Sequence, residues 1–289
     1  MAVKGRLFLV GLLAVGSGVL AESDPMADLL RNRDLQTHYQ NRLQGDEVIE
    51  LSTPDERFFA LTLEQESATP QGGILILHDA GQTPDWPFLL QQSRTYLPVV
   101  GWTTLSIALP IPQRDATAWQ PLDPDAAPER VEETDEQWQQ RVLARIASGI
   151  KELNEQGNFN LAILGYGDGA YWAGRYLTER MAPEEADGYA LILWQAPLAR
   201  PEVADYISQL TIPILDLYMG ESVALNRAAR QRKAAAARAR HPDYLQIHDA
   251  ERQSFYAAPA ISRSTRRVWG WLRNHAGGNE ATVAGPADP

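Results

Sequence analysis

The sequence predicts an α/β fold: a doubly wound, mainly parallel sheet with helices on both faces and a leading antiparallel hairpin. Three observations predict it. Short, continuous apolar segments of strand length recur along the chain, amphipathic segments fill the gaps between them, and two segments of alternating polarity come first. Strands that are apolar on both faces belong to sheets covered on both sides, and alternating strands and helices favour parallel pairing.

The leading segments predict a helix and then a hairpin. Residues 25–43 predict a short exposed helix on the outside of the fold. Residues 47–52 and 58–63 alternate apolar and polar side chains on either side of a Thr-Pro-Asp turn at residues 53–55. That pattern is typical of two antiparallel strands joined by a tight connection.

The rest of the chain alternates strands and helices. The buried strands that we expect are residues 74–77, 104–109, 161–164, 190–193, 214–217 and 244–247. The helices that we expect are residues 85–97, 134–156, 170–181, 202–210, 222–240 and 262–275. We find no repeat and no linker, so residues 22–275 are expected to form one domain, with a long loop over residues 110–135 and a disordered tail over residues 276–289.

Composition excludes several classes of protein. The 289 residues contain no cysteine, which excludes disulfide scaffolds, zinc sites with cysteine ligands and thiol catalysis. The formal charge of -11 argues against a nucleic-acid partner, because phosphate binding needs a basic face. The five histidines show no metal-binding spacing, so we expect no metal and no cofactor.

The first 21 residues predict a cleavable signal peptide. Lys4 and Arg6 precede an apolar stretch from Leu7 to Leu20, and a Val-Leu-Ala tripeptide ending at Ala21 fits a signal-peptidase site. The stretch is short for a membrane span, which needs about 20 apolar residues. An uncleaved N-terminal anchor is the alternative. Cleavage after Ala21 takes the formal charge from -11 to -13, since only two basic residues are lost, and the periplasm is the expected destination.

A glycine-rich turn joins the strand at residues 161–164 to the helix that follows. The segment Gly165-Tyr166-Gly167-Asp168-Gly169 resembles the nucleophile elbow of the α/β-hydrolase superfamily, whose pattern is G-x-S-x-G. In that pattern, crowding requires small residues two positions before and after the nucleophile, and Gly165 and Gly169 meet the requirement. The nucleophile position then falls on Gly167, which has no side chain.

Two other interpretations of this turn remain. Asp168 could be the nucleophile, as in haloalkane dehalogenases of the same superfamily, but Tyr166 would then occupy a position that needs a small residue. A phosphate-binding glycine loop is the other possibility, although the spacing lacks the final glycine and the ribose-binding acid of that motif.

The segment Leu77-His78-Asp79-Ala80-Gly81 follows the strand at residues 74–77, with Trp86 just beyond it. In serine hydrolases of this fold, this loop supplies one amide of the oxyanion hole and the residue after the nucleophile, here Asp168, supplies the other. A carboxylate at Asp168 would disfavour acyl transfer there. The alternative is structural: His78 and Asp79 cap the following segment and hold the loop.

The remaining triad positions are also poorly filled. Glu221 is the candidate acid but is displaced from the usual place, and Asp216 is as well explained as a buried partner of an arginine. Alignment on Phe255 puts Gln253 where the histidine should be, and His248 comes five residues too early. Glycine and glutamine cannot act as nucleophile and base, so ordinary serine-hydrolase activity is not expected.

Residues 30–275 as a whole resemble an α/β-hydrolase-like family of Gram-negative bacteria known only as a domain of unknown function. The resemblance rests on the His78-Asp79 loop with Trp86, the strand and turn at residues 101–110, and the elbow at residues 165–170. It implies the hydrolase fold and an elbow without serine as family features, and it implies no established activity.

Two weaker features concern partners. A helix over residues 222–240 is rich in basic residues, and a weak contact with an anionic partner is possible there through Arg227, Arg230, Arg232 and Lys233. A solvated helix that balances an acidic protein is the simpler interpretation. Five tryptophans could line a ligand pocket, although most are expected in the core: Trp86, Trp119, Trp138, Trp172 and Trp194.

The sequence therefore favours an exported, non-catalytic protein that binds an unknown small molecule or envelope component. The alternative hypothesis is an ester or amide hydrolase with a non-standard catalytic set, in which Asp168 or Ser254 acts with His78 and Glu221.

Overall fold

The computed structural model describes residues 25–112, 133–186, 188–249 and 261–276. Within these ranges, eight strands form one sheet in the order β1-β2-β4-β3-β5-β6-β7-β8. The strands are β1 (Val48–Ser52), β2 (Arg57–Leu63), β3 (Gly72–Leu77), β4 (Trp102–Ile107), β5 (Leu161–Tyr166), β6 (Tyr189–Trp194), β7 (Ile214–Met219) and β8 (Tyr244–Asp249). β1, β2 and β4 pair antiparallel, and every pair from β4 to β8 is parallel. The predicted fold class is confirmed.

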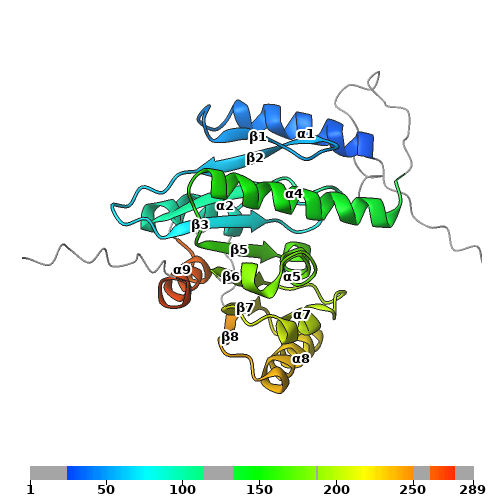
Figure 1. The fold of residues 1–289 in the computed structure, drawn as a ribbon, viewed down its shortest axis with the longest axis vertical. Coiled ribbons are helices and arrows are strands. Elements are labelled where there is room, and N and C mark those ends of the chain that lie inside the picture. The colour runs from blue at the N-terminus through cyan, green and yellow to red at the C-terminus, as the bar shows by residue number, and fades with distance from the viewer. Residues whose placement is uncertain (1–24, 113–132, 187, 250–260, 277–289) are drawn as a thin grey trace, which may run out of the picture.

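Helices connect the strands on both sides of this sheet (Figure 1). They are α1 (Pro25–Gln40), α2 (Leu89–Tyr96), the 3-10 turn η1 (Pro98–Val100), α4 (Asp135–Glu155), α5 (Asp168–Glu179), α6 (Pro183–Ala186), α7 (Val203–Gln209), α8 (Val223–Ala239) and α9 (Arg263–His275). The predicted signal peptide, most of the predicted long loop and nearly all of the predicted tail lie outside the described residues.

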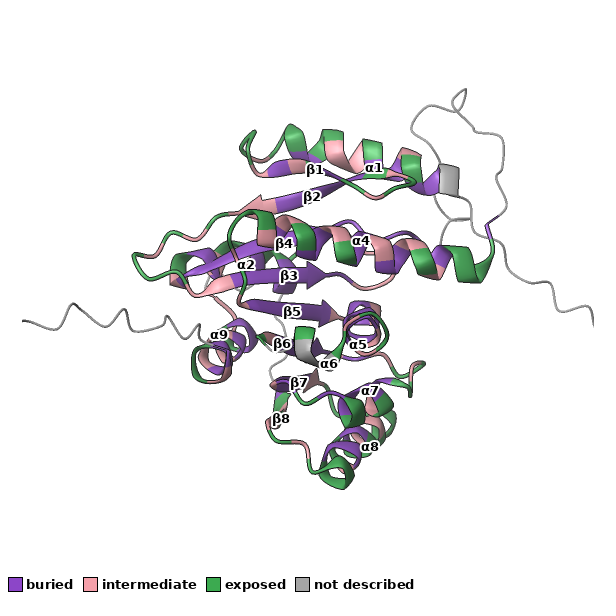
Figure 2. Cartoon of the chain, viewed as in Figure 1, coloured by how far each residue is buried: buried purple, intermediate pink, exposed green. Residues whose placement is uncertain are grey.

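Two apolar layers separate the helices from the sheet. Alternate strand residues such as Leu75 and Leu77 face α4, α5 and α7, while Ile74 and Ile76 face α2 and α9. Figure 2 shows the result: the central strands are buried along most of their length, and α4 buries one side and exposes the other. Because both faces are covered, the central strands are apolar on both sides, as the sequence indicated.

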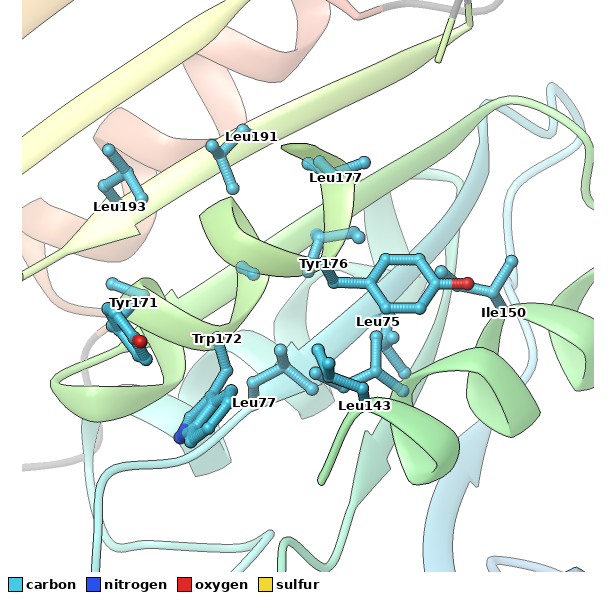
Figure 3. Packing of buried hydrophobic residues seen from close by; sticks show 14 of the residues in the cluster. Leu75, Leu77, Leu143, Ile150, Tyr171, Trp172, Tyr176, Leu177, Leu191 and Leu193 are labelled. Atoms are coloured by element: carbon cyan, nitrogen blue, oxygen red, sulfur yellow. The ribbon is translucent and has the colours of Figure 1, made fainter. Parts of the chain in front are cut away.

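The larger layer is built where α4 and α5 meet the sheet. Figure 3 shows Leu75 and Leu77 of β3, Leu143 and Ile150 of α4, Tyr171, Trp172, Tyr176 and Leu177 of α5, and Leu191 and Leu193 of β6. The Trp172 ring meets the Trp138 ring edge-on at 5.3 Å. This packing fixes α5, and therefore its first residue, against the sheet.

The predicted start of α4 agrees with the structure and that of α2 does not, each for an identifiable reason. α4 begins after Thr134, whose side chain accepts a hydrogen bond from Gln137 N in a capping box, so its predicted start is correct to one residue. α2 begins at Leu89, four residues later than predicted. Trp86 precedes Pro87, and a residue before proline is disfavoured in the helical conformation.

α1 forms where the sequence predicted a helix, and its buried face is largely polar. Leu29 is 46 % exposed, whereas Asp28, Arg31 and Asn32 are buried. The first turns of the helix are therefore held by polar contacts that an apolar periodicity cannot reveal, whereas Leu35 and Tyr39 near its end pack in an apolar cluster with Phe59 and Leu61.

Those contacts form a buried ion-pair network, which we call the α1–α4 network. Arg145 of α4 is fully buried and donates to both carboxylate oxygens of Glu56 at 2.7 and 2.6 Å and to the Ala108 carbonyl at 2.8 Å. Its guanidinium also bonds Asp28 at 2.5 Å, and Arg141 bridges Asp28, Glu56 and Glu133. Burial has the largest single effect on Asp28 and raises its pKa, but the combined effects of Arg145, Arg141, the Ile111 amide and Arg31 outweigh it and keep that pKa below its usual value. The network ties α1, the hairpin, the segment after β4 and α4 together.

Candidate functional site

The candidate site lies at the carboxyl ends of the parallel strands, where β5 turns into α5. β5 ends at Tyr166 and α5 begins at Asp168, so the single residue Gly167 makes the whole turn. Its φ of 58° and ψ of -126° lie in a region that side chains rarely tolerate. The turn is the strand-turn-helix context that a nucleophile elbow requires.

The backbone is crowded on both sides of Gly167, so the two positions that flank this turn residue, Gly165 and Gly169, have no room for a side chain. A Cβ atom on Gly165 would overlap the Gly169 backbone, and one on Gly169 would overlap the Leu77 carbonyl oxygen. This backbone corresponds to the register in which Gly167, and not Asp168, occupies the nucleophile position.

The side chain of Asp79 fills the space that a nucleophile would occupy. A Cβ atom built on Gly167 would overlap the Asp79 Cγ and both carboxylate oxygens. Asp79 Oδ1 accepts hydrogen bonds from the Asp168 amide at 2.7 Å and from the Ala80 amide at 2.9 Å. Asp79 thus comes from the loop after β3 and lies over the elbow.

The two amides correspond in position to the donors of an oxyanion hole. One belongs to the residue after the nucleophile position and the other to the loop after β3, as in hydrolases of this fold. Oxyanion-hole donors lie 2.7–3.1 Å from the oxygen that they stabilise. Here both bond the chain's own carboxylate, so the arrangement already holds a negative oxygen without any substrate.

His78 is held entirely by the main chain. Its side chain is buried, its Nδ1 bonds the Asp79 carbonyl at 2.7 Å, and the Leu109 amide donates to its Nε2 at 2.9 Å. Since Nε2 accepts, the ring proton lies on Nδ1. Burial lowers the pKa of His78 to about 3, so the ring is neutral near pH 7. With both nitrogens engaged by backbone groups, this geometry offers no acceptor for a substrate proton.

Of the other candidate residues, Asp168 lines a small pocket together with His78, whereas Glu221 and His248 are not among the described residues that line it. Asp168 is the first residue of α5 and is partly exposed, and Glu221 is an exposed residue between β7 and α8. His248 is exposed, stacks on Tyr218 at 4.7 Å and bonds the Gly220 carbonyl oxygen through Nε2 at 2.8 Å. Gln253 and Ser254 lie outside the described residues.

Asp216 has the structural role that the sequence suggested. It is fully buried in β7 and holds Arg232 through two hydrogen bonds of 2.8 and 3.0 Å, while Tyr244 donates to it at 2.7 Å. The expectation that Arg232 belongs to an exposed basic surface is therefore wrong. Arg227, Arg230 and Lys233 are exposed, and a groove beside α8 also contains the carboxylates of Glu202 and Asp205.

Most of the tryptophans belong to the core, as expected. Trp138, Trp172 and Trp194 are buried, whereas Trp86 is 41 % exposed. Trp119 lies outside the described residues.

A small hollow opens above Gly167. Its volume is about 250 Å³. The lining residues are Asp79, Tyr166, Gly167, Gln195, Ala196, Pro197, Leu198, Ser222 and Leu225. The sequence predicted a ligand cleft formed by the loops after Leu77, Leu109, Leu164 and Gln195, but it assigned no role to the Gln195 side chain. The φ of 56° marks Gln195 as a strained residue just after β6. Its position at a strand's carboxyl end was the available signal.

Neither a metal centre nor a membrane span is found in the part of the chain that the structure describes. No group of three or more histidine, aspartate and glutamate side chains there could hold a metal ion. No described helix is long and apolar enough to cross a membrane.

Solved structures similar to this chain include an esterase and a putative dienelactone hydrolase. An esterase of Pyrococcus furiosus is 11 % identical, with a TM-score of 0.55, and the match covers 80 % of this chain and 92 % of the esterase chain. A putative dienelactone hydrolase of Klebsiella pneumoniae is 15 % identical, with a TM-score of 0.55, and the match covers 79 % of this chain and 98 % of the hydrolase chain. Est1E of Butyrivibrio proteoclasticus is 11 % identical, with a TM-score of 0.54, and the match covers 79 % of this chain and 98 % of the Est1E chain. At these identities the likeness shows the fold alone, which is the α/β-hydrolase fold.

No curated protein matches the chain. A family described as a protein of unknown function, DUF3530, matches residues 21–274, and the chain belongs to this family.

Proposed function

We propose that this protein is a non-catalytic binding protein with an α/β-hydrolase fold, exported to the cell envelope, which holds a small molecule or an envelope component at the elbow. One observation carries the proposal. The Asp79 carboxylate lies where the side chain of a nucleophile would lie. It accepts hydrogen bonds from both amides that would otherwise stabilise an oxyanion.

Acyl transfer needs three things that this elbow does not offer in the described residues. It needs a nucleophile at the turn, and Gly167 has no side chain. It needs a base, and both His78 nitrogens are engaged by the backbone. It also needs free oxyanion donors, whose removal one at a time costs about 10²–10³ in kcat in hydrolases. A negative carboxylate in the oxyanion position would repel the developing charge as well.

Turnover measurements on the mature chain test this proposal. We expect no labelling by a fluorophosphonate and no hydrolysis of a broad panel of esters and amides above the buffer rate. The alternative, a hydrolase with a non-standard set, requires turnover that Asp168→Asn, His78→Ala, Glu221→Gln or Ser254→Ala abolishes. Turnover lost in any of these variants, with the fold intact by circular dichroism, would contradict the non-catalytic proposal.

Export is supported by the sequence of residues 1–21 and is tested by the N-terminus of the protein recovered from cells. We expect the protein in the periplasmic fraction to begin at Glu22. Recovery of the intact chain from the membrane fraction would instead support an uncleaved N-terminal anchor.

A further inference from the structure

The hollow above Gly167 combines apolar walls with one carboxylate. Ala196, Pro197, Leu198 and Leu225 supply the apolar part of the lining. Leu198 is 49 % exposed, so its side chain is available to a ligand that enters from solvent. A concave apolar surface with a single well-placed polar group is the usual form of a small-molecule site.

Asp79 is the charged side chain among the described lining residues, and one of its oxygens is available. Oδ1 accepts the Ala80 and Asp168 amides, whereas Oδ2 accepts no hydrogen bond in the described part of the chain. No lysine, arginine or histidine lines the hollow within the described residues. A ligand here therefore meets a negative charge that no cation among the described lining residues neutralises.

The walls around this carboxylate are held in place. Gln195 is fixed by its own amide, because Met219 N donates to its Oε1 at 2.8 Å and its Nε2 donates to the Met219 carbonyl at 3.4 Å. The Tyr166 ring meets the Trp194 ring edge-on at 6.2 Å. Burial, and secondarily the Asp79 charge, raises the pKa of Tyr166, so its phenol stays neutral. The site is thus formed before any ligand arrives.

We infer that this hollow binds small organic monocations, with an ammonium group on Asp79 Oδ2 and an apolar group against Leu198 and Leu225. The inference rests on the proposed non-catalytic function, since the carboxylate must keep its place over Gly167. An ammonium donates hydrogen bonds to a carboxylate that are stronger than neutral ones. An organic anion would be repelled by the same oxygen, and a neutral alcohol would donate a weaker hydrogen bond to it than an ammonium does.

Calorimetric titration of the mature chain at pH 7 tests the inference with three ligands of one shape: benzylammonium, benzyl alcohol and benzoate. We expect benzylammonium to bind at least tenfold more tightly than benzyl alcohol and benzoate not to bind. In Asp79→Asn, whose side chain keeps an oxygen acceptor for both amides, benzylammonium should lose at least tenfold in affinity.

A second pair of variants separates the apolar contact from the charge. Leu198→Ala should weaken benzylammonium several-fold, because it removes apolar area from the wall. Val223→Ala is the matched control, since Val223 is 82 % exposed nearby and is not among the described lining residues, and it should change nothing.

Equal or tighter binding of benzoate, unchanged binding of the ammonium in Asp79→Asn, or no binding by any of the three ligands would each overturn the inference. None of these results bears on turnover, so the non-catalytic proposal would stand. Ester hydrolysis by the wild-type chain would overturn that proposal instead.

Discussion

The Asp79 carboxylate accepts a 2.7 Å hydrogen bond from the main-chain amide of Asp168, a residue 89 positions later in the chain. This bond joins the loop after β3 to the first turn of α5 and places the carboxylate over Gly167. An anion is stabilised at a helix N-terminus by free amides and by the helix dipole. The elbow of this protein therefore binds a carboxylate of its own chain at the N-terminus of α5.

Removing the Asp79 side chain should open an anion site that a small carboxylate can fill. Asp79→Gly leaves the Ala80 and Asp168 amides without their acceptor, at a cost of about 1–3 kcal/mol. Formate at ten times its dissociation constant should restore about 1.4 kcal/mol. Thermal unfolding in formate, against chloride at equal ionic strength, measures the effect. Asp79→Asn keeps an acceptor and serves as the control, so an equal formate response in both variants would contradict the account.

His78 should make the protein less stable as the pH falls below neutrality. Burial holds its folded pKa at about 3, while the unfolded pKa is close to 6.5. Between pH 6.5 and pH 3 the histidine is protonated in the unfolded chain and neutral in the folded chain, so folding becomes less favourable as the pH falls. From pH 7 to pH 5 this effect amounts to about 2 kcal/mol. Burial also lowers the pKa of His241, which acts in the same direction.

Urea unfolding at pH 7 and pH 5 measures this dependence. His78→Gln should flatten it, whereas His38→Gln, a change on the exposed side of α1, should leave it as in the wild type. The same pH dependence in His78→Gln as in the wild type would show that His78 is not held neutral.

The strands and the elbow could be predicted from local sequence pattern, whereas the position of the Asp79 side chain could not. The strands at residues 74–77, 161–164 and 190–193 could be predicted because a strand covered on both faces must be apolar throughout. The elbow could be placed because Gly165 and Gly169 satisfy a steric rule. The role of Asp79 depends on where the loop after β3 meets α5, and that meeting is set by packing across 89 residues. No spacing within one segment encodes it.

The buried polar network was hidden from the sequence for a similar reason. Arg145 lies on the buried face of an amphipathic helix, where pattern alone favours an apolar residue. Its partners come from α1, the hairpin turn and the segment after β4. Only the assembled fold shows that a charge at this position is compensated.

Arg145 should be among the residues most costly to replace. Arg145→Met leaves the Asp28 and Glu56 carboxylates with only part of their compensation in a buried site, and should cost about 3 kcal/mol or more in the free energy of unfolding. Arg57→Met is the matched control, because the Arg57 side chain is 77 % exposed and its pair with Glu50 should contribute less than about 1 kcal/mol. Urea unfolding of both variants checks the difference, and equal costs would contradict the account.

Arg232 and Arg230 should respond differently to the same substitution although they lie two residues apart on α8. Arg232→Met leaves the fully buried Asp216 without its cationic partner and should cost about 3 kcal/mol or more. Arg230 is exposed, and Arg230→Met should stay within about 0.5 kcal/mol of the wild type. Thermal and urea unfolding of the two variants measure this, and a similar loss in both would show that the Asp216 pair is not the cause.

A double-mutant cycle between Gly167 and Asp79 tests most directly the claim that the carboxylate occupies the nucleophile's place. Gly167→Ala adds one Cβ atom. When Asp79 is present this atom overlaps the Asp79 carboxylate. The substitution should then lower the free energy of unfolding by about 3 kcal/mol or more, through overlap and backbone strain. In the Asp79→Gly background only the strain at φ 58° remains, about 1–2 kcal/mol. Urea unfolding of the four proteins should therefore give a coupling free energy of at least about 1 kcal/mol, and an equal cost of Gly167→Ala in both backgrounds would contradict the account.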